Sequence, residues 1–323
     1  DGKTMTRLRP FKLTPKLVPK IWGGHHLVDL WHKREPQEPR EKLGESWEVA
    51  DLPEGQSVVA SGPLEGKTLR EVVESHALEL LGDEEKQSFP LLVKLLDAAD
   101  DLSVQVHPGK QHEGVMPGAR SKDEAWVILH TRPGGAILHG LKEGVTREDF
   151  SACIASGDDP TALMRRREVR PGDVVHVPPG TMHAICAGVS LLEIQQPSDT
   201  TYRVWDYNRP GLDGLPRDLH IEQALAVTNF GAQPPITQQP REESEQRSVL
   251  VEAEDYSIEL WNFQRTLDLE LPTRAHVLHV IEGALSIPDA NLDLKMGESA
   301  IIPACCGALT LEAAEKTTFV LAR

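Results

Sequence analysis

Hydrophobic and polar positions alternate along most of the chain in short runs that end at proline or glycine. Such runs include "SWEVADL", "DEAWVILH", "GAILHGL", "SLLEIQQ", "HVLHVIEGALSI" and "ESAIIPA". Alternation with a period of two is typical of β-strands, and many of the 24 prolines and 25 glycines lie between the runs. The pattern therefore predicts a mainly β protein, an all-β sandwich or barrel with a few helices.

Helical spacing is confined to three stretches. In "KTLREVVESHALELLG" (67–82) the apolar residues recur with roughly helical spacing, and Gly82 can end the helix. The stretch 146–169 predicts two short helices broken at 157–160, and "DLHIEQALAVTNF" (218–230) predicts a further one. These helices are expected to decorate the strands.

The 323 residues are enough for two domains. The polar, proline-rich stretch 236–246 has the composition of a linker. We therefore predict an N-terminal catalytic domain with helical segments over 1–235, the linker over 236–246, and a shorter β domain over 247–323.

Composition and charge exclude several partners. The net charge is −16 and there is no long basic run, which disfavours nucleic acid. The four cysteines lack CxxC spacing and indicate a reducing compartment. Neither a run of about 18 apolar residues nor an N-terminal hydrophobic signal core is present. We expect a cytoplasmic protein without membrane association, as a monomer or a homodimer.

Two stretches repeat one pattern. "GDVVHVPPGTMH" (172–183) and "GESAIIPACCGA" (297–308) share a glycine, a short strand and a proline, but Ala308 stands where the first stretch has His183. The first stretch resembles the second motif of the cupin superfamily of β-barrels. The resemblance implies two cupin-like, jelly-roll barrels, of which the C-terminal one is degenerate and lacks metal ligands. Coincidence between two β-hairpins is the alternative.

A polar strand face suggests the partners of His183. In "LSVQVHP" (102–108) the alternation places Gln105 and His107 on one face, and Glu124 opens the apolar strand "EAWVIL". Two imidazoles, a carboxylate and an amide suit Zn²⁺, with Mn²⁺, Co²⁺ or Fe²⁺ as rivals. Taken singly, each histidine is more often a satisfied core or surface residue than a ligand.

Together these motifs resemble the type I mannose-6-phosphate isomerases, most closely the short bacterial form. The matching stretches are "PKIWGG", "GESWEVAD", "FPLLVKLLDAADDLSVQVHP", "KDEAWVIL", "VPPGTMHAI" and "LLEIQQPSDTTYRVWDYNR". The resemblance implies a zinc-dependent isomerase that interconverts mannose 6-phosphate and fructose 6-phosphate through a cis-enediol. It places one zinc ion per chain on Gln105, His107, Glu124 and His183. It places the active-site arginine on Arg203, and family lysines on Lys94 and Lys122.

The chemistry assigns further roles. Arg203 is always charged and suits an orienting group or a phosphate clamp, with a surface pair to Asp199 or Asp206 as the alternative. We expect desolvation to lower the pKa of Lys94 if its ammonium group does not reach solvent. Trp22 and Glu48 are expected to wall the sugar pocket, with core packing an equal alternative for the tryptophan. The proton-transfer base stays open between Lys122, Glu193 and a metal-bound hydroxide.

Two other functions compete with the isomerase. A metal cupin dioxygenase would use the same ligands, but Arg203 and the lysines would then have no obvious role. A non-catalytic sugar-phosphate-binding protein would have kept the fold and the metal without turnover. Metal analysis followed by an isomerase assay separates the three.

Overall fold

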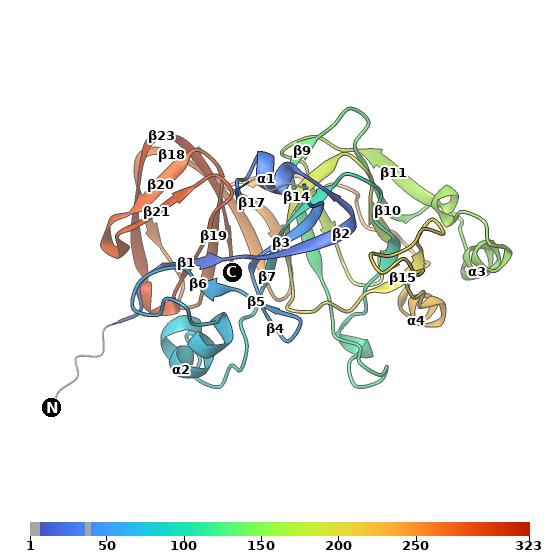
Figure 1. Ribbon diagram of the computed structural model, residues 1–323, viewed down its shortest axis with the longest axis horizontal. Coiled ribbons are helices and arrows are strands. Elements are labelled where there is room, and N and C mark those ends of the chain that lie inside the picture. Colours follow the sequence, from blue (N-terminus) through green and yellow to red (C-terminus); the bar gives the residue numbers. More distant parts are fainter. Residues whose placement is uncertain (1–6, 36–39) are drawn as a thin grey trace.

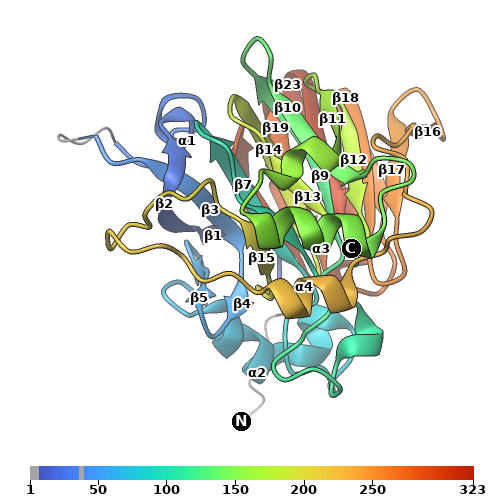
Figure 2. The same ribbon diagram turned by 90° about the vertical axis from the view of Figure 1, so that its right-hand side faces the viewer.

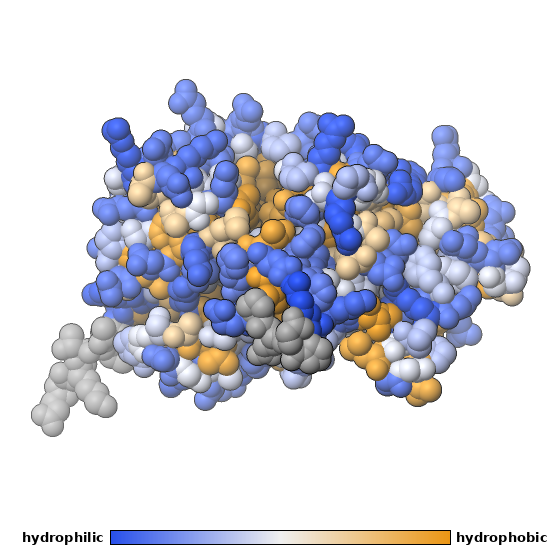
Figure 3. Space-filling view, turned by 45° about the horizontal axis from the view of Figure 1, so that its top comes forward, coloured by the Kyte–Doolittle hydropathy of each residue, from blue (hydrophilic) through white to orange (hydrophobic). Residues whose placement is uncertain are grey.

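The computed structural model describes residues 7–35 and 40–323, and strands dominate it (Figure 1). The predicted mainly β class is confirmed. On the face shown in Figure 3, hydrophilic side chains predominate, and apolar ones show mainly near the middle. The apolar positions of the strands are otherwise packed inside, in clusters between the sheets.

Two sheets form the N-terminal part of the molecule. The first has the order β12 (Val174–Val177), β9 (Glu124–Thr131), β14 (Val189–Gln195), β7 (Leu92–Ala98), β2 (Lys16–Gly24) and β3 (Leu43–Val49). The second has the order β11 (Met164–Glu168), β10 (Ala136–Leu141), β13 (His183–Ile185), β8 (Val104–Val106) and β15 (Tyr202–Trp205). One apolar cluster joins Leu96 and Trp126 of the first sheet to Ile137 and Ile185 of the second, so the sheets pack face to face.

A ten-stranded sheet, here the C-terminal sheet, lies beside them (Figures 1 and 2). Its strands are β16 (Arg241–Glu242), β17 (Arg247–Glu252), β18 (Ser257–Glu270), β23 (Ala308–Ala322), β19 (His276–Glu282), β22 (Ser299–Ile302), β1 (Phe11–Thr14) and β6 (Val58–Val59), with β20 (Ala284–Ile287) and β21 (Leu292–Lys295) beside β23. β4 (Asp51–Leu52) and β5 (Gly55–Gln56) form a separate hairpin.

The N-terminal strands reach into the C-terminal sheet. Phe11 of β1 pairs with Ile301 of β22, and Leu13 of β1 pairs with Val59 of β6. One apolar cluster likewise runs from Leu27 through Leu192 to Ile258. The division into 1–235 and 247–323 stays a prediction, and the two parts share a sheet and a core. The predicted linker carries β16, and Gln238 bridges to Val174 at the edge of β12.

The helices are short, and capping residues mark where the longest of them, α2, begins and ends. They are α1 (His26–Asp29), α2 (Leu69–Leu81), α3 (Arg147–Ser156) and α4 (Ile221–Val227), with 3₁₀ turns at Lys110–His112, Pro160–Leu163, Pro288–Ala290 and Ala304–Cys306. A Thr68–Glu71 capping box opens α2, and Gly82 ends it in the left-handed conformation with φ 76°. The helices predicted over 67–82 and 218–230 are confirmed.

The second helix predicted within 146–169 is wrong. After α3 and a 3₁₀ turn, Met164–Glu168 forms strand β11, which pairs with β10 at the edge of the second sheet. Its charged residues are largely exposed, as suits an edge strand. Tertiary pairing with β10 outweighs the helical preference of the arginines.

Candidate metal centre and catalytic cavity

A row of polar side chains crosses the second sheet. Gln105 of β8 pairs with His183 on one side and with Arg203 on the other. Directly paired residues project from the same face of a sheet, so the three side chains lie in one row. Val104 and Val106 face the other way into a core cluster and are fully buried. The polar face of this strand is thus turned into the protein, as the sequence suggested.

The first sheet supplies the facing residues. Glu124 is the first residue of β9, and Glu193 of β14 pairs with both Lys94 of β7 and Trp126 of β9. Lys94, Glu124 and Glu193 are all buried. The polar groups of both sheets therefore meet in the space between them.

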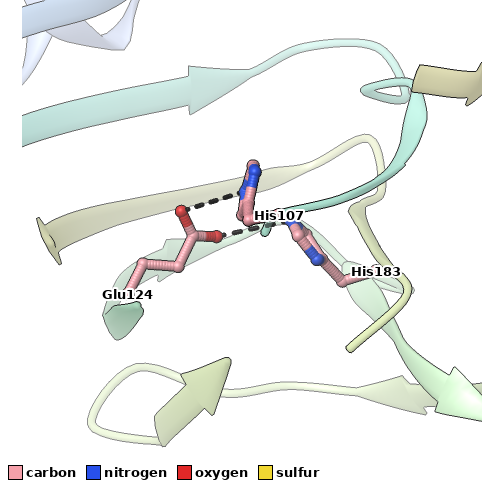
Figure 4. Close-up of side chains that lie close together, drawn as sticks. All are labelled: His107, Glu124 and His183. Atoms are coloured by element: carbon pink, nitrogen blue, oxygen red, sulfur yellow. Dashed lines mark ion pairs between the residues drawn. The ribbon is translucent and has the colours of Figure 1, made fainter. Parts of the chain in front are cut away.

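His107, Glu124 and His183 form a compact cluster (Figure 4). Each offers a ligand atom, and these atoms lie within 4.8 Å of one another. His107 Nε2 is 3.4 Å from Glu124 Oε2, and His183 Nε2 is 3.4 Å from Glu124 Oε1. All three side chains are about 1% exposed. Within the described residues this is the one such group of three.

Backbone carbonyls fix the orientation of both imidazoles. His107 Nδ1 donates to the Thr200 carbonyl at 3.0 Å, and His183 Nδ1 donates to the Thr181 carbonyl at 2.8 Å. Each Nε2 therefore carries no proton and faces the carboxylate, as metal-binding histidines require. Gln105 completes the row, because its Nε2 lies 3.4 Å from His183 Nε2.

The ionisation states of Glu124 and His107 also suit the binding of a metal cation. Burial raises the pKa of Glu124, but Lys122 and the two histidines outweigh it, and its pKa lies well below the ordinary value. Burial and then Lys122 lower the pKa of His107 to about 3. Both Glu124 oxygens are buried and make no hydrogen bond to any described residue, although Lys122 Nζ lies 2.8 Å from Oε2. An ionised, buried carboxylate between two neutral imidazoles is a donor set that fits Zn²⁺.

Lys94 differs from the expectation. Burial lowers its pKa, but Glu193, Glu45 and Asp199 outweigh burial and raise the pKa above the ordinary value. Its Nζ lies 3.3 Å from Glu193 Oε1 and 3.8 Å from Asp199 Oδ1, and stands over the Trp47 ring. The expected lowering of the Lys94 pKa is therefore wrong. Its carboxylate partners lie far from Lys94 in the sequence, so their effect on its pKa could not be anticipated. Lys94 is a buried cation.

Arg203 reaches the cavity without an acidic partner among the described residues. Its Nε donates to Ser103 Oγ at 3.1 Å, and its Nη1 donates to the Asp218 carbonyl at 3.0 Å. The alternative pairings with Asp199 or Asp206 do not form: Asp206 instead binds Arg209 and Arg217. Burial and then Arg217 lower the pKa of Arg203. Its positive charge is available to an anionic ligand.

A cavity of about 230 Å³ contains these groups. Gln105, Lys122, Glu124, His183, Lys94, Arg203 and Trp22 line it, whereas His107 lies behind Glu124 and Lys122. Sequence reasoning missed Lys20, Glu45, Ser103, Asp199, Arg217 and His220, which also line it. Lys20, Glu45, Ser103 and Asp199 lie within the matching stretches quoted above, whereas Arg217 and His220 lie outside them.

The placement of Glu48 in the sugar pocket is wrong. Along β3, Glu45 and Trp47 project towards Lys94, and Glu48 projects the opposite way. Glu48 instead pairs with Lys33 at 2.7 Å and accepts a hydrogen bond from Ser299 at 3.3 Å. Alternation along the strand allows only one of Glu45 and Glu48 to reach the cavity, and it is Glu45.

The C-terminal sheet has a buried imidazole at the position equivalent to Glu124. Glu124 pairs with Val177, the residue before Pro178, and His276 pairs with Ile302, the residue before Pro303. His276 is 1% exposed, and neither ring nitrogen has a hydrogen-bond partner among the described residues. The internal repeat of the sequence thus extends to the register of the strands.

Comparison with known proteins gives consistent results. The family described as "Phosphomannose isomerase type I, catalytic domain" matches residues 10–125. The chain is 37% identical over 303 residues to the putative mannose-6-phosphate isomerase YvyI of Bacillus subtilis, covering 91% of this chain and 93% of the relative. It is 35% identical over 308 residues to ManA of the same organism, covering 94% and 96%.

Two solved structures extend the comparison. The mannose 6-phosphate isomerase from Bacillus subtilis superposes with a TM-score of 0.87 at 34% identity, covering 98% of this chain and 100% of that chain. A mannose 6-phosphate isomerase "bound with zinc and yttrium" superposes with a TM-score of 0.75 at 19% identity, covering 97% and 99%. The second similarity concerns the fold alone.

Proposed function

The chain belongs to the type I mannose-6-phosphate isomerases, and from this premise we propose that it interconverts mannose 6-phosphate and fructose 6-phosphate in the cavity between its two N-terminal sheets. One observation carries the assignment: the buried His107–Glu124–His183 cluster shares that cavity with Arg203, which has no carboxylate partner among the described residues. A metal-binding oxygenase would not need the arginine and lysines in this place, and the assay below separates a sugar-phosphate-binding protein without turnover from the isomerase. The alternatives are not favoured.

Zinc is the metal that we propose, held by His107, Glu124, His183 and the amide oxygen of Gln105. The fit rests on the buried, ionised carboxylate of Glu124 and on the two imidazoles, whose Nδ1 atoms are held by backbone carbonyls and whose Nε2 atoms face that carboxylate. The amide of Gln105 can present oxygen after a half-turn, which leaves its shape unchanged. When bound, zinc supplies Lewis-acid stabilisation of negative charge on the sugar oxygens.

The positive side chains receive the anionic substrate. Lys20, Arg203 and Arg217 line the cavity of a chain whose net charge is −16, so they create local attraction against the overall field. Arg203 follows Gln105 in the polar row and is therefore the cation that we place at the reacting carbons, where enediolate charge develops. Arg217, held by Asp206 at 2.6 Å, is placed at the phosphate.

Proton transfer between C1 and C2 needs a group that can take and return a proton. Burial and then Glu124 raise the pKa of Glu193, whereas the pKa of Glu45 is lowered to about 2 because Lys94 and Lys20 outweigh its burial. Glu193 is therefore the carboxyl group that we assign as base. Lys122 hydrogen-bonds the sugar oxygens, and Lys94 holds Glu193 in position through its contact at 3.3 Å.

The experiment is a coupled assay for fructose 6-phosphate with purified protein of known metal content. Turnover of mannose 6-phosphate that disappears with chelator and returns with Zn²⁺ supports the assignment. Protein that has zinc bound and shows no turnover contradicts it.

In ²H₂O, Glu193→Gln is expected to lose exchange of the C2 hydrogen while its zinc content stays at the wild-type value. Wild-type exchange in this variant would remove Glu193 as the base.

The setting of the enzyme is proposed at a coarser level. None of the helices in the described residues is both long and apolar enough to cross a membrane. A cytoplasmic location, a monomeric or homodimeric state, and the lack of nucleic-acid binding stay predictions.

A further inference from the structure

The turn between β17 and β18, residues 253–256 and here called the C-terminal turn, contacts the segment that carries Lys122 and Glu124. Tyr256 of this turn donates a hydrogen bond from its hydroxyl to Asp123 Oδ1 at 2.6 Å. Asp123 stands between Lys122 and Glu124 in the sequence, and its side chain does not line the catalytic cavity. The C-terminal sheet thus binds the residue between two groups of the site.

The segment 121–123 belongs to no strand or helix, so its position depends on such contacts. The side-chain oxygen Oε1 of Gln196 accepts hydrogen bonds from the backbone N–H of Asp123 and from Ser121 Oγ, both at 2.8 Å. The backbone N–H of Gln196 donates to the backbone carbonyl of Asp123 at 3.0 Å. Gln196 Nε2 donates in turn to Asp255 of the C-terminal turn at 2.5 Å. Two adjacent residues of this turn therefore hold the segment, one directly and one through Gln196.

The surroundings of Tyr256 and Asp123 restrict the movement of both side chains. Tyr256 is 3% exposed, and its ring belongs to the apolar cluster shared by the two parts of the molecule. The carboxylate of Asp123 also binds His176 Nε2 of β12 at 2.8 Å, which leaves little freedom for rotation. A short hydrogen bond from a neutral hydroxyl to a carboxylate is among the stronger kinds. A packed ring thus fixes the backbone between Lys122 and Glu124.

We propose that the C-terminal turn positions Lys122 and Glu124 for isomerisation, with Tyr256 and Asp255 as positioning residues that act through Asp123 and Gln196. Neither residue lines the catalytic cavity, so neither is expected to touch the substrate. The inference rests on the proposed roles of Lys122 and Glu124. It gives the C-terminal sheet a part in catalysis although that sheet contributes no residue to the metal cluster.

The main test variant is Tyr256→Phe, which keeps the packed ring and removes the hydrogen bond. We expect kcat to fall on the order of tenfold with KM unchanged within about twofold, as for outer-shell partners of metal ligands. Zinc affinity, measured by chelator competition, is expected to fall in parallel. The visible spectrum of the Co²⁺-substituted protein is expected to change, because it reports the geometry of the ligands directly.

A matched control distinguishes positioning from general loosening. Ser299→Ala removes a different hydrogen bond between the C-terminal sheet and the N-terminal part, the one to Glu48. Its kcat and Co²⁺ spectrum are expected to stay at wild-type values even where its thermal midpoint drops as far as that of Tyr256→Phe. Asp123→Asn, which keeps an acceptor for Tyr256, is expected to retain more activity than Asp123→Ala.

Two results would overturn the inference. One is a Tyr256→Phe protein with wild-type kcat, zinc affinity and Co²⁺ spectrum; the other is an equal loss of kcat in Ser299→Ala. Should Tyr256→Phe fail to fold, Asp255→Ala provides the same comparison at a partly exposed position. A wild-type protein without turnover or metal would instead contradict the proposed function, so the two failures are distinguishable.

Discussion

The buried pair of Lys94 and Glu193 allows a quantitative prediction. Lys94→Met keeps the length of the side chain and removes its charge, leaving Glu193 buried without its cation. At 3.3 Å and an effective dielectric constant near 20, the Coulomb energy of the pair is about 5 kcal/mol. Breaking a buried pair from one side typically costs about 3–5 kcal/mol. We expect the free energy of unfolding of Lys94→Met to fall by this amount at neutral pH.

The pH dependence of the loss has a definite sign. Without Lys94, burial and Glu124 still raise the pKa of Glu193 above the ordinary value of 4.5. A raised pKa means that the folded state holds the proton more tightly than the unfolded state. Stability is then greatest below about pH 4.5 and is lost as the pH rises through the folded-state pKa. The Lys94→Met variant is therefore expected to lose less stability at pH 5 than at pH 8.

The assay is urea unfolding of a double-mutant cycle with Glu193→Gln, at both pH values and with zinc present. The double variant removes both charges, so it is expected to regain at least about 2 kcal/mol over Lys94→Met. Lys20→Met is the control, because its pair with Glu45 at 3.2 Å is partly exposed and should contribute less than about 1 kcal/mol. A coupling energy below about 0.5 kcal/mol, or a loss independent of pH, would refute the reasoning.

Three further outcomes follow from the site and the C-terminal sheet. His183→Ala is expected to lose bound zinc on dialysis while His220→Ala, which lines the cavity outside the cluster, keeps it; equal zinc content in both by emission spectroscopy would be inconsistent with the ligand set. Arg203→Lys is expected to lower kcat on the order of a hundredfold at wild-type zinc content, since it loses the planar guanidinium fork; steady-state assays measure this. Burial lowers the pKa of His276 from 6.5 to about 4, so its contribution is present above pH 6.5 and is lost as the pH falls towards 4, by at most about 3 kcal/mol. Urea unfolding of His276→Leu at pH 7.5 and pH 5 should accordingly show a smaller drop than the wild type, and an equal drop would argue against this account.

The strand pattern pointed to the residues of the His107–Glu124–His183 cluster because each of the proposed ligands has a local signal. Gln105 and His107 share the face of an alternating strand, and Glu124 and His183 begin strands beside apolar runs. A strand has two faces, however, and its sequence does not say which one meets the cavity. For "GESWEVAD" the prediction chose Glu48, whereas pairing with β7 directs Glu45 to the cavity.

The features of the site that could not be predicted from the sequence depend on contacts between distant segments. The pKa of Lys94 follows from Glu193, Asp199 and Glu45, which three different segments bring to its ammonium group. Arg217 reaches the cavity from an irregular stretch and is held there by Asp206. Local periodicity carries no information on contacts between distant segments, whereas it predicted the mainly β class and the helices α2, α3 and α4.

The pairing of β1 with β22 also constrains how the chain can fold during synthesis. Phe11 and Ile301 lie far apart in the sequence, so β1 is synthesised long before β22 can pair with it. Until then Phe11 and Lys12 lack their strand partner, since β6 pairs only with Leu13 and Thr14, and an unpaired strand edge promotes aggregation. Closing so long a loop is slow. The synthesis of β22 therefore decides when this part of β1 becomes protected.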